Sequence, residues 1–316
     1  MDSYADFYRR SIEHRDAFWA EQAQLIDWQQ PPRQICDYSQ PPFAKWFVGG
    51  TTNLCHNAVD RHLKERAEQP ALIFVSTETG HERVYCFREL HAEVQRMAAV
   101  LQSLGVGKGD RVLIYMPMIA EAAFAMLACV RIGALHCVVF GGFASGSLAT
   151  RIDDAEPTVI ISADAGSRGG KPVPYKHLLD EAIGLARHQP KAVLLVDRGL
   201  APMTLHDRRD HLWGPLREQH LATEVPCEWV DATHPSYTLY TSGTTGKPKG
   251  VQRDTGGYAV ALAASMKHIC ARPWPEGEMA EAWQHLRRNG GKAVMPRLLR
   301  YIAERADLGA GREALF

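Results

Sequence analysis

Tyr240-Thr-Ser-Gly-Thr-Thr-Gly-Lys-Pro-Lys-Gly250 is the stretch around which the rest of the chain is interpreted. It combines glycines, hydroxyl side chains and lysines directly after Ser236–Tyr240, an apolar run typical of a β-strand. Glycine lets backbone amides approach a ligand, and successive amides form a concave anion-binding site. Hydroxyl and ammonium groups add hydrogen-bond donors and positive charge. The stretch therefore predicts a polyphosphate site beyond the end of a strand.

The residues alone leave a second interpretation of this loop open. The common P-loop has four residues between its glycines and a Ser or Thr after its lysine. Here two residues separate Gly243 from Gly246, and Pro248 follows Lys247. Gly, Ser, Thr and Lys are also ordinary residues of a solvated connector. Composition alone supports the connector and the phosphate site about equally.

The complete string resembles the phosphate-binding loop of the acyl-adenylate-forming enzymes, which include acyl-CoA synthetases, peptide-synthetase adenylation domains and luciferases. The next segment, Gln252–Tyr258, resembles short-chain acyl-CoA synthetases, and propionate–CoA ligases more than acetate–CoA ligases. The resemblance extends from about Asp2 to Ile269. It implies that the ATP phosphates are bound by Thr241, Ser242, Gly243, Thr244, Thr245, Gly246, Lys247 and Lys249.

A second candidate loop is Arg168-Gly169-Gly170-Lys171, in which two cations flank a glycine pair. Its charge suits a phosphate. Without the resemblance, an exposed polar turn is favoured about two to one, because surface Arg and Lys are common. The resemblance implies that this loop contacts coenzyme A. Val139–Phe143, followed by Arg151-Ile152, also resembles the synthetases, and we expect its glycines to allow tight packing without chemistry.

Bulk composition indicates a soluble globular protein. Its 316 residues suffice for one large or two ordinary domains, and 46% of them are hydrophobic. Lys+Arg and Asp+Glu are equal at 36 each, so no bulk charge favours nucleic-acid or membrane partners, and any anion-binding site must be local. The resemblance implies small-molecule substrates. The seven cysteines show no Cys-x-x-Cys spacing, and the N-terminus lacks a signal-peptide pattern. We expect a cytoplasmic location.

The order of apolar runs predicts an α/β fold: a partial doubly wound, mostly parallel sheet with an N-terminal helical arm over residues 3–28. Strands and helices alternate from residue 71 to 197. Gly105–Gly109 is predicted to be a turn, since Asp110 stands where a dinucleotide fingerprint needs glycine. Residues 198–233 are predicted to be a surface excursion. The expected divisions are 1–65, a synthetase-like N-terminal segment, 66–269, a partial AMP-binding domain, and 270–316, an unmatched tail.

Two groups of polar residues invite a metal-site interpretation that the sequence does not favour. His56 and His62 are isolated, and isolated histidines are more often structural. No recognised ligand spacing supports a site in the cluster His206, Asp207, Asp210 and His211, which is expected to be a solvated loop or helix.

The resemblance ends near Cys270, although Glu276–Arg288 and Pro296–Leu308 are predicted to be helices. The family's Gln-Thr-Glu and Thr-Gly-Asp motifs and its catalytic lysine are not found in this chain. A truncated or frameshifted gene is the simplest hypothesis, and a natural short variant is the other. Sheet edges without partners would then favour self-association.

Three functions are compatible with the sequence. The first is an acyl-CoA synthetase that uses ATP, Mg²⁺ and coenzyme A to activate a short carboxylic acid, propionate above others. The second, preferred for this polypeptide, is a catalytically incomplete remnant that binds ATP or coenzyme A weakly. The third is another ATP-using enzyme, such as a phosphotransferase. No catalytic residue is assigned.

Overall fold

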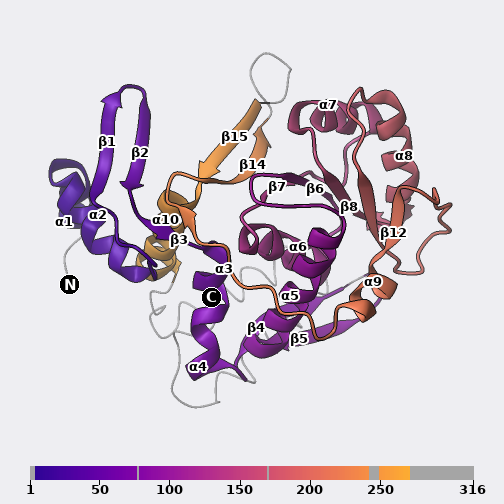
Figure 1. Ribbon diagram of the computed structural model, residues 1–316, viewed down its shortest axis with the longest axis horizontal. Coiled ribbons are helices and arrows are strands. Elements are labelled where there is room, and N and C mark those ends of the chain that lie inside the picture. Colours follow the sequence, from indigo (N-terminus) through magenta and orange to yellow (C-terminus); the bar gives the residue numbers. More distant parts are fainter. Residues whose placement is uncertain (1–3, 77, 169–170, 242–248, 271–316) are drawn as a thin grey trace, which may run out of the picture.

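A seven-stranded sheet forms the centre of the structure (Figure 1). The computed structural model describes residues 4–76, 78–168, 171–241 and 249–270. Along the sheet the strands are β12 (Asp210–Leu212), β11 (Ala192–Val196), β8 (Val159–Ala163), β6 (Arg111–Tyr115), β7 (Leu135–Val138), β14 (Pro235–Thr241) and β15 (Lys249–Asp254). Neighbouring strands are parallel, except that β14 and β15 form an antiparallel hairpin.

The chain winds outward from β6 in both directions. The crossover through α6 (Ala120–Arg131) leads to β7, and the crossover through α8 (Tyr175–Leu185) leads from β8 away to β11. Because such crossovers are right-handed, opposite directions place α6 and α8 on opposite faces of the sheet. α5 (Phe87–Ser103) packs beside α6, and α7 (Ser145–Ala155) packs beside α8. This confirms the predicted doubly wound α/β fold.

The core lies between the central strands and these helices. Every residue of β8 and β11 is buried, as are four of the five residues of β6. Strands covered on both faces need continuous apolar runs, and these runs made them predictable. In α5 the predicted apolar stripe is buried, from Leu90 through Val94 and Met97 to Leu101. Gly105 follows with a φ of 86°, a left-handed conformation that suits glycine at a helix end.

The N-terminal arm packs against the end of the described chain. Its helices are α1 (Tyr4–Glu13), α2 (Arg15–Gln22) and the 3₁₀ turn η1 (Ala23–Leu25). A second apolar cluster joins Ala23, Ile26 and Phe47 to Ala259 and Val260 of α10 (Thr255–Ser265). Figure 1 shows this arm beside α10, on the opposite side of the molecule from β12. The predicted packing arm is confirmed.

One prediction about irregular structure was wrong, and one hairpin was not predicted. β1 (Gln34–Gln40) and β2 (Phe43–Val48) form this hairpin, with Pro41-Pro42 in its turn. Residues 198–233 were expected to be a surface excursion, but they contain β12, α9 (Trp213–Gln219) and β13 (Val230–Asp231). β12 joins the central sheet beside β11, so tertiary pairing determines a structure that local sequence does not show.

The remaining elements are short. They are β3 (Thr51–Thr52), α3 (Leu54–Ala58), η2 (Asp60–His62), α4 (Leu63–Arg66), β4 (Pro70–Val75), β5 (Glu82–Cys86), β9 (Gly166–Arg168), β10 (Lys171–Val173) and the π-helical turn η3 (Met266–Cys270). Within the described residues, no helix combines the length and apolar character needed to cross a bilayer. The two helices predicted after residue 270 lie outside the described residues.

Candidate active site

Two neighbouring strands carry the ends of the predicted phosphate loop. β14 ends at Thr241 and β15 begins at Lys249, and these residues pair across the hairpin. The Thr241 hydroxyl donates to the Lys249 carbonyl oxygen over 3.4 Å, and both residues are exposed. The rest of the predicted site lies outside the described residues and stays a prediction: Ser242, Gly243, Thr244, Thr245, Gly246 and Lys247.

Tyr240 anchors the strand that leads into this loop. Its hydroxyl donates to Asp154 Oδ2 over 2.6 Å, which ties β14 to the end of α7. The Arg151 guanidinium lies 5.4 Å from the centre of the Tyr240 ring and 4.0 Å from that of Phe143. Burial, together with the hydrogen bond to Asp154, raises the pKa of Tyr240, so the hydroxyl stays neutral. Sequence reasoning missed Asp154, because nothing in its spacing shows that α7 lies beside β14.

A cavity of about 520 Å³ adjoins this anchor and touches Lys249. Its lining includes the cations Arg111 and Lys249, His136 of β7 and Asp154 of α7. His136 stacks on Tyr237 with ring centres 5.4 Å apart, and burial lowers the pKa of His136 to about 4. The imidazole is therefore neutral at physiological pH, and Lys249 is the cation that this cavity shares with the loop.

The predicted coenzyme A loop is a small β-hairpin. β9 and β10 pair antiparallel, with Lys171 opposite Arg168. The pairing places both predicted cations on adjoining strands, and the Lys171 side chain is exposed. Gly169 and Gly170 lie outside the described residues. The assignment of this hairpin to coenzyme A stays a prediction.

The strands that lead into the two loops, β8 and β14, end at the same edge of the sheet. β9 follows the carboxyl end of β8, and the phosphate loop follows the carboxyl end of β14. β6 and β7 lie between β8 and β14, which puts those strand ends about 14 Å apart at the usual strand spacing. Ligands of doubly wound sheets bind beyond this edge, near the point where the winding direction changes. The two loops therefore flank the expected ligand position.

Close packing behind the edge fixes the segment between them. The Tyr115 hydroxyl donates to the carbonyl oxygens of Phe143 and Gly141, at 3.2 and 3.4 Å. A Cβ atom at Gly141 would overlap the Tyr175 hydroxyl. The expectation that the glycines of Val139–Phe143 serve tight packing is confirmed at this position.

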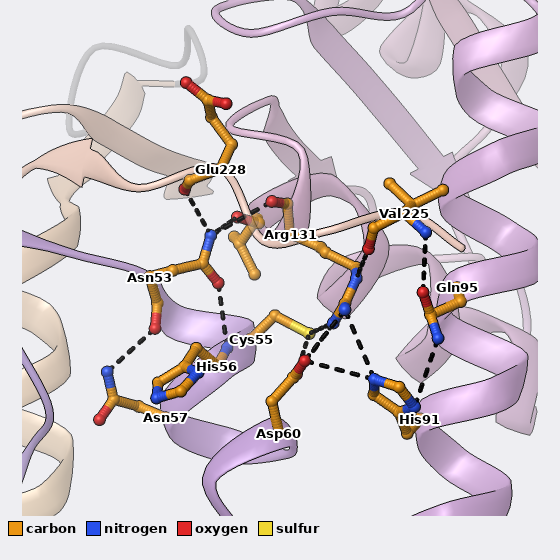
Figure 2. Close-up of polar contacts among 11 residues, drawn as sticks. Asn53, Cys55, His56, Asn57, Asp60, His91, Gln95, Arg131, Val225 and Glu228 are labelled. Atoms are coloured by element: carbon orange, nitrogen blue, oxygen red, sulfur yellow. Dashed lines mark hydrogen bonds and ion pairs between the residues drawn. The ribbon is translucent and has the colours of Figure 1, made fainter. Parts of the chain in front are cut away.

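A largely buried polar network surrounds Arg131, as Figure 2 shows. Arg131, at the end of α6, donates from Nη1 and Nη2 to the two carboxylate oxygens of Asp60, each over 2.9 Å. Its Nε donates to the Val225 carbonyl oxygen over 2.6 Å, and His91 Nε2 lies 3.3 Å from Asp60 Oδ1. Asn53 Nδ2 donates to the Glu228 carbonyl oxygen over 2.8 Å.

The network contains the described group that comes nearest to a metal site. The ligand atoms of Cys55, Asp60 and Cys227 lie within 4.8 Å of one another. Arg131 already neutralises Asp60 and donates to Cys55 Sγ over 3.4 Å. The Arg131 guanidinium therefore supplies the positive charge that a metal ion would otherwise bring to these two ligands. A hydrogen bond with Cys227 and burial raise the pKa of Cys55, which disfavours the thiolate that binds metals. The chemistry of these residues does not fit a metal ion.

The histidine clusters also have structural partners. His56 Nε2 lies 3.1 Å from Asp27 Oδ2, and the His62 ring packs 5.0 Å from that of Phe87. Asp210 accepts from Arg209 Nε over 2.6 Å and lies 3.0 Å from Lys176 Nζ. Asp210 is therefore paired with two cations. The expectation of a solvated loop or helix is wrong for Asp210 and His211, because both lie in β12, which pairs with β11, and the Asp210 side chain is buried.

Comparison with known families identifies the class of protein. Residues 59–286 match the family described as AMP-binding enzyme, and residues 4–58 match the acetyl-coenzyme A synthetase N-terminus. The chain belongs to the AMP-binding enzyme family. The resemblance stated from the loop residues is thus confirmed.

Individual relatives place the chain within that family. It is 64% identical over 267 residues to a propionate–CoA ligase of Salmonella typhimurium and 62% identical over 267 residues to one of Escherichia coli. Each comparison covers 84% of this chain and 42% of the relative. An acetyl-coenzyme A synthetase of Methylobacterium radiotolerans is 46% identical over 280 residues, covering 87% of this chain and 43% of the relative.

A solved structure agrees with the fold. Acetoacetyl-CoA synthetase from Streptomyces lividans has a TM-score of 0.77 and 29% sequence identity, covering 86% of this chain and 41% of that chain. The chain thus spans about two fifths of the length of the relatives it matches.

The Arg131–Asp60 pair leads to a prediction about pH. Burial alone would raise the pKa of Asp60, but hydrogen bonds from His91 and Arg131 outweigh it and hold this pKa well below its ordinary value. A lowered carboxyl pKa gives stability that is present above the unfolded pKa of about 3.9 and is lost as pH falls below it. Asp60→Asn should cost about 3–5 kcal/mol of unfolding free energy at pH 7. That difference from the parent should stay constant down to about pH 5 and shrink below pH 4.

Urea unfolding at pH 7, 5 and 3 measures both quantities. Glu68→Gln is the matched control, because the Glu68–Arg88 pair is exposed and should contribute less than about 1 kcal/mol. An Asp60→Asn effect as small as that of the control would contradict the proposed role of the buried pair.

The packing at Gly141 leads to a second prediction. Gly141→Ala forces the added methyl against the Tyr175 hydroxyl and should destabilise the chain by about 1–3 kcal/mol. Gly184→Ala in α8 is the control, since nothing lies within 4 Å of the added atom, and it should be neutral or stabilising by up to about 1 kcal/mol because Ala favours a helix. Urea midpoints compare the two variants, and equal midpoints would refute the packing argument.

Proposed function

We propose that the chain supplies the ATP-phosphate and coenzyme A binding elements for ligation of a short-chain carboxylate, propionate above others, to coenzyme A. The observation that carries this proposal is the glycine-, hydroxyl- and lysine-rich loop between β14 and β15, at the carboxyl edge of a doubly wound sheet. Relatives at 64% and 62% identity that are named propionate–CoA ligase support the choice of acid.

The first half-reaction makes the carboxylate a usable acyl donor. A carboxylate oxygen attacks the α-phosphorus of ATP, and the bond to the β-phosphate oxygen breaks, giving acyl-AMP and pyrophosphate. Hydroxyl and ammonium groups of the loop neutralise the β- and γ-phosphates as negative charge develops on pyrophosphate. Mg²⁺ enters this scheme with ATP as its counter-ion, as part of the substrate.

The second half-reaction forms the thioester. The thiol sulfur of coenzyme A attacks the acyl carbonyl carbon, its proton leaves to solvent, and AMP departs with the electron pair of the acyl–oxygen bond. The cations Arg168 and Lys171 of the β9–β10 hairpin would hold phosphate groups of coenzyme A. The roughly 14 Å between the strand ends leaves room for both nucleotides at one edge.

One observation favours a second candidate function. The chain spans 42% of the length of its propionate–CoA ligase relatives. A catalytically incomplete chain would bind MgATP or coenzyme A without turnover. Its site would still use the same loop and hairpin.

The proposed ligation reaction also indicates the partners and the cellular location of the chain. ATP, coenzyme A and a short acid are small molecules, and no other partner is needed for the reaction. The thiols of six cysteines are free, in keeping with a reducing compartment: Cys36, Cys55, Cys86, Cys129, Cys137 and Cys227. We propose that the chain acts in the cytoplasm.

A binding experiment tests the phosphate loop. Lys247→Ala and Lys249→Ala should each weaken MgATP binding about tenfold or more, because each removes a charge-assisted contact to phosphate. Lys191→Ala is the matched control, since Lys191 is exposed and precedes β11 at the opposite edge of the sheet. Calorimetric titration measures all three, and equal losses for the loop and control variants would contradict the assignment.

A product assay separates the functions. The purified chain is incubated with ATP, Mg²⁺, propionate and coenzyme A, and products are identified by mass spectrometry. AMP and propionyl-CoA in equal amounts indicate the ligase, and ADP indicates a phosphotransferase. MgATP binding without either product indicates the incomplete chain.

The outer strand β15 leads to a prediction about self-association. β15 ends the sheet, and Leu239 and Val251 on the hairpin are 48% and 36% exposed. Edge strands with exposed apolar side chains pair readily with other chains. Val251→Lys should therefore shift the chain toward monomer, while Val84→Lys on the small β4–β5 sheet should not. Light scattering after size exclusion gives the masses, and a monomeric parent would end this proposal.

A further inference from the structure

We propose that Glu78 and Arg198 form a clamp that fixes the backbone of β9 and thereby positions Arg168 and Lys171 for the phosphates of coenzyme A. This inference rests on the coenzyme A binding proposed above. It concerns two residues that the phosphate and coenzyme A motifs do not include, so they are positioning residues and not ligands.

The clamp is formed by side chains from two distant segments. Glu78 lies in the turn between β4 and β5, and Arg198 lies two residues after β11. Arg198 Nη2 forms an ion pair with Glu78 Oε2, and Arg198 Nη1 donates to the Ala165 carbonyl oxygen over 2.9 Å. Glu78 Oε1 accepts from the Ser167 amide over 2.7 Å. The two side chains thus hold the backbone on both sides of Gly166.

Burial makes this arrangement stronger than an ordinary surface ion pair. The Arg198 side chain is 8% exposed and that of Glu78 is 21% exposed. Exposed pairs contribute little because water competes for them, whereas removal of one partner from a shielded pair leaves the other charge uncompensated. Arg198 contacts both Glu78 and the Ala165 carbonyl oxygen, so it holds the base of the hairpin at two points.

The register of the hairpin links the clamped Ser167 to the two predicted cations. Ser167 precedes Arg168 and pairs with Pro172, and Arg168 pairs with Lys171. Fixing the Ser167 amide therefore fixes the register position of both cations. Tyr175 holds β9 from another side, because a Cβ atom at Gly166 would lie 2.9 Å from its ring.

The sequence between the cations explains why a clamp is useful. Gly169 and Gly170 separate Arg168 from Lys171, and glycine loses more conformational entropy than other residues when it is ordered. Ordering of a binding segment weakens ligand affinity, and prior fixation reduces that loss. A hairpin held at its base presents its cations with less entropy to lose on binding.

Hydrogen exchange and ligand titration of the full chain test the clamp. In Arg198→Met and Glu78→Ala, exchange of amides 165–173 should speed up about tenfold, with other segments unchanged. Affinity for coenzyme A should fall about tenfold, and affinity for MgATP should stay the same. Glu78→Gln keeps an acceptor for the Ser167 amide, so its effects should be smaller than those of Glu78→Ala. Arg88→Met, which breaks an exposed pair, is the control.

The outcomes separate this inference from the proposed function. A parent chain that binds no coenzyme A removes the proposed function and the positioning role with it. Unchanged hairpin exchange and unchanged coenzyme A affinity in the variants of a chain that does bind would overturn the clamp alone. Faster exchange throughout the chain, with MgATP and coenzyme A affinity falling together, would also overturn it, because the pair would then stabilise the whole fold.

Discussion

The buried ion pair between Arg131 and Asp60 joins segments that lie far apart in the sequence. Asp60 belongs to the N-terminal part, Arg131 ends the helix α6 of the central sheet, and the Val225 carbonyl that Arg131 also binds precedes β13 (Figure 2). Charges this poorly exposed, 4% for Arg131 and 18% for Asp60, tolerate little displacement. The pair therefore fixes the frame on which the strands carrying both loops are built.

The central sheet could be predicted because its strands obey a simple constraint. β6, β8 and β11 are covered on both faces, so their sequences are apolar throughout, and polar or glycine-containing turns separate them from amphipathic helices. β12 has no such pattern in Asp210–Leu212, since its place depends on pairing with β11. The β1–β2 hairpin was missed for a related reason: prolines exclude a central strand but suit the turn between two edge strands.

In the candidate site, too, some residues could be predicted from the sequence and others could not. The loop residues were predictable because phosphate binding requires glycine, hydroxyl and lysine side chains close together in sequence. The residues that position those loops were not, because each acts across the fold. Asp154 meets Tyr240 from 86 positions away, and Glu78 meets the Ser167 amide from 89 positions away. Such contacts depend on which helix and turn the topology places beside a strand end, and no local pattern records that.

The antiparallel pairing of Thr241 with Lys249 also changes what anion binding requires of the loop. Paired strands hold the two ends of residues 242–248 about 5 Å apart whether or not a ligand is present. The entropy lost in bringing those ends together belongs to folding of the hairpin. Anion binding then starts from two fixed points, Thr241 and Lys249. A loop on a single strand, with its other end on a distant helix, would need the ligand to close the chain as well.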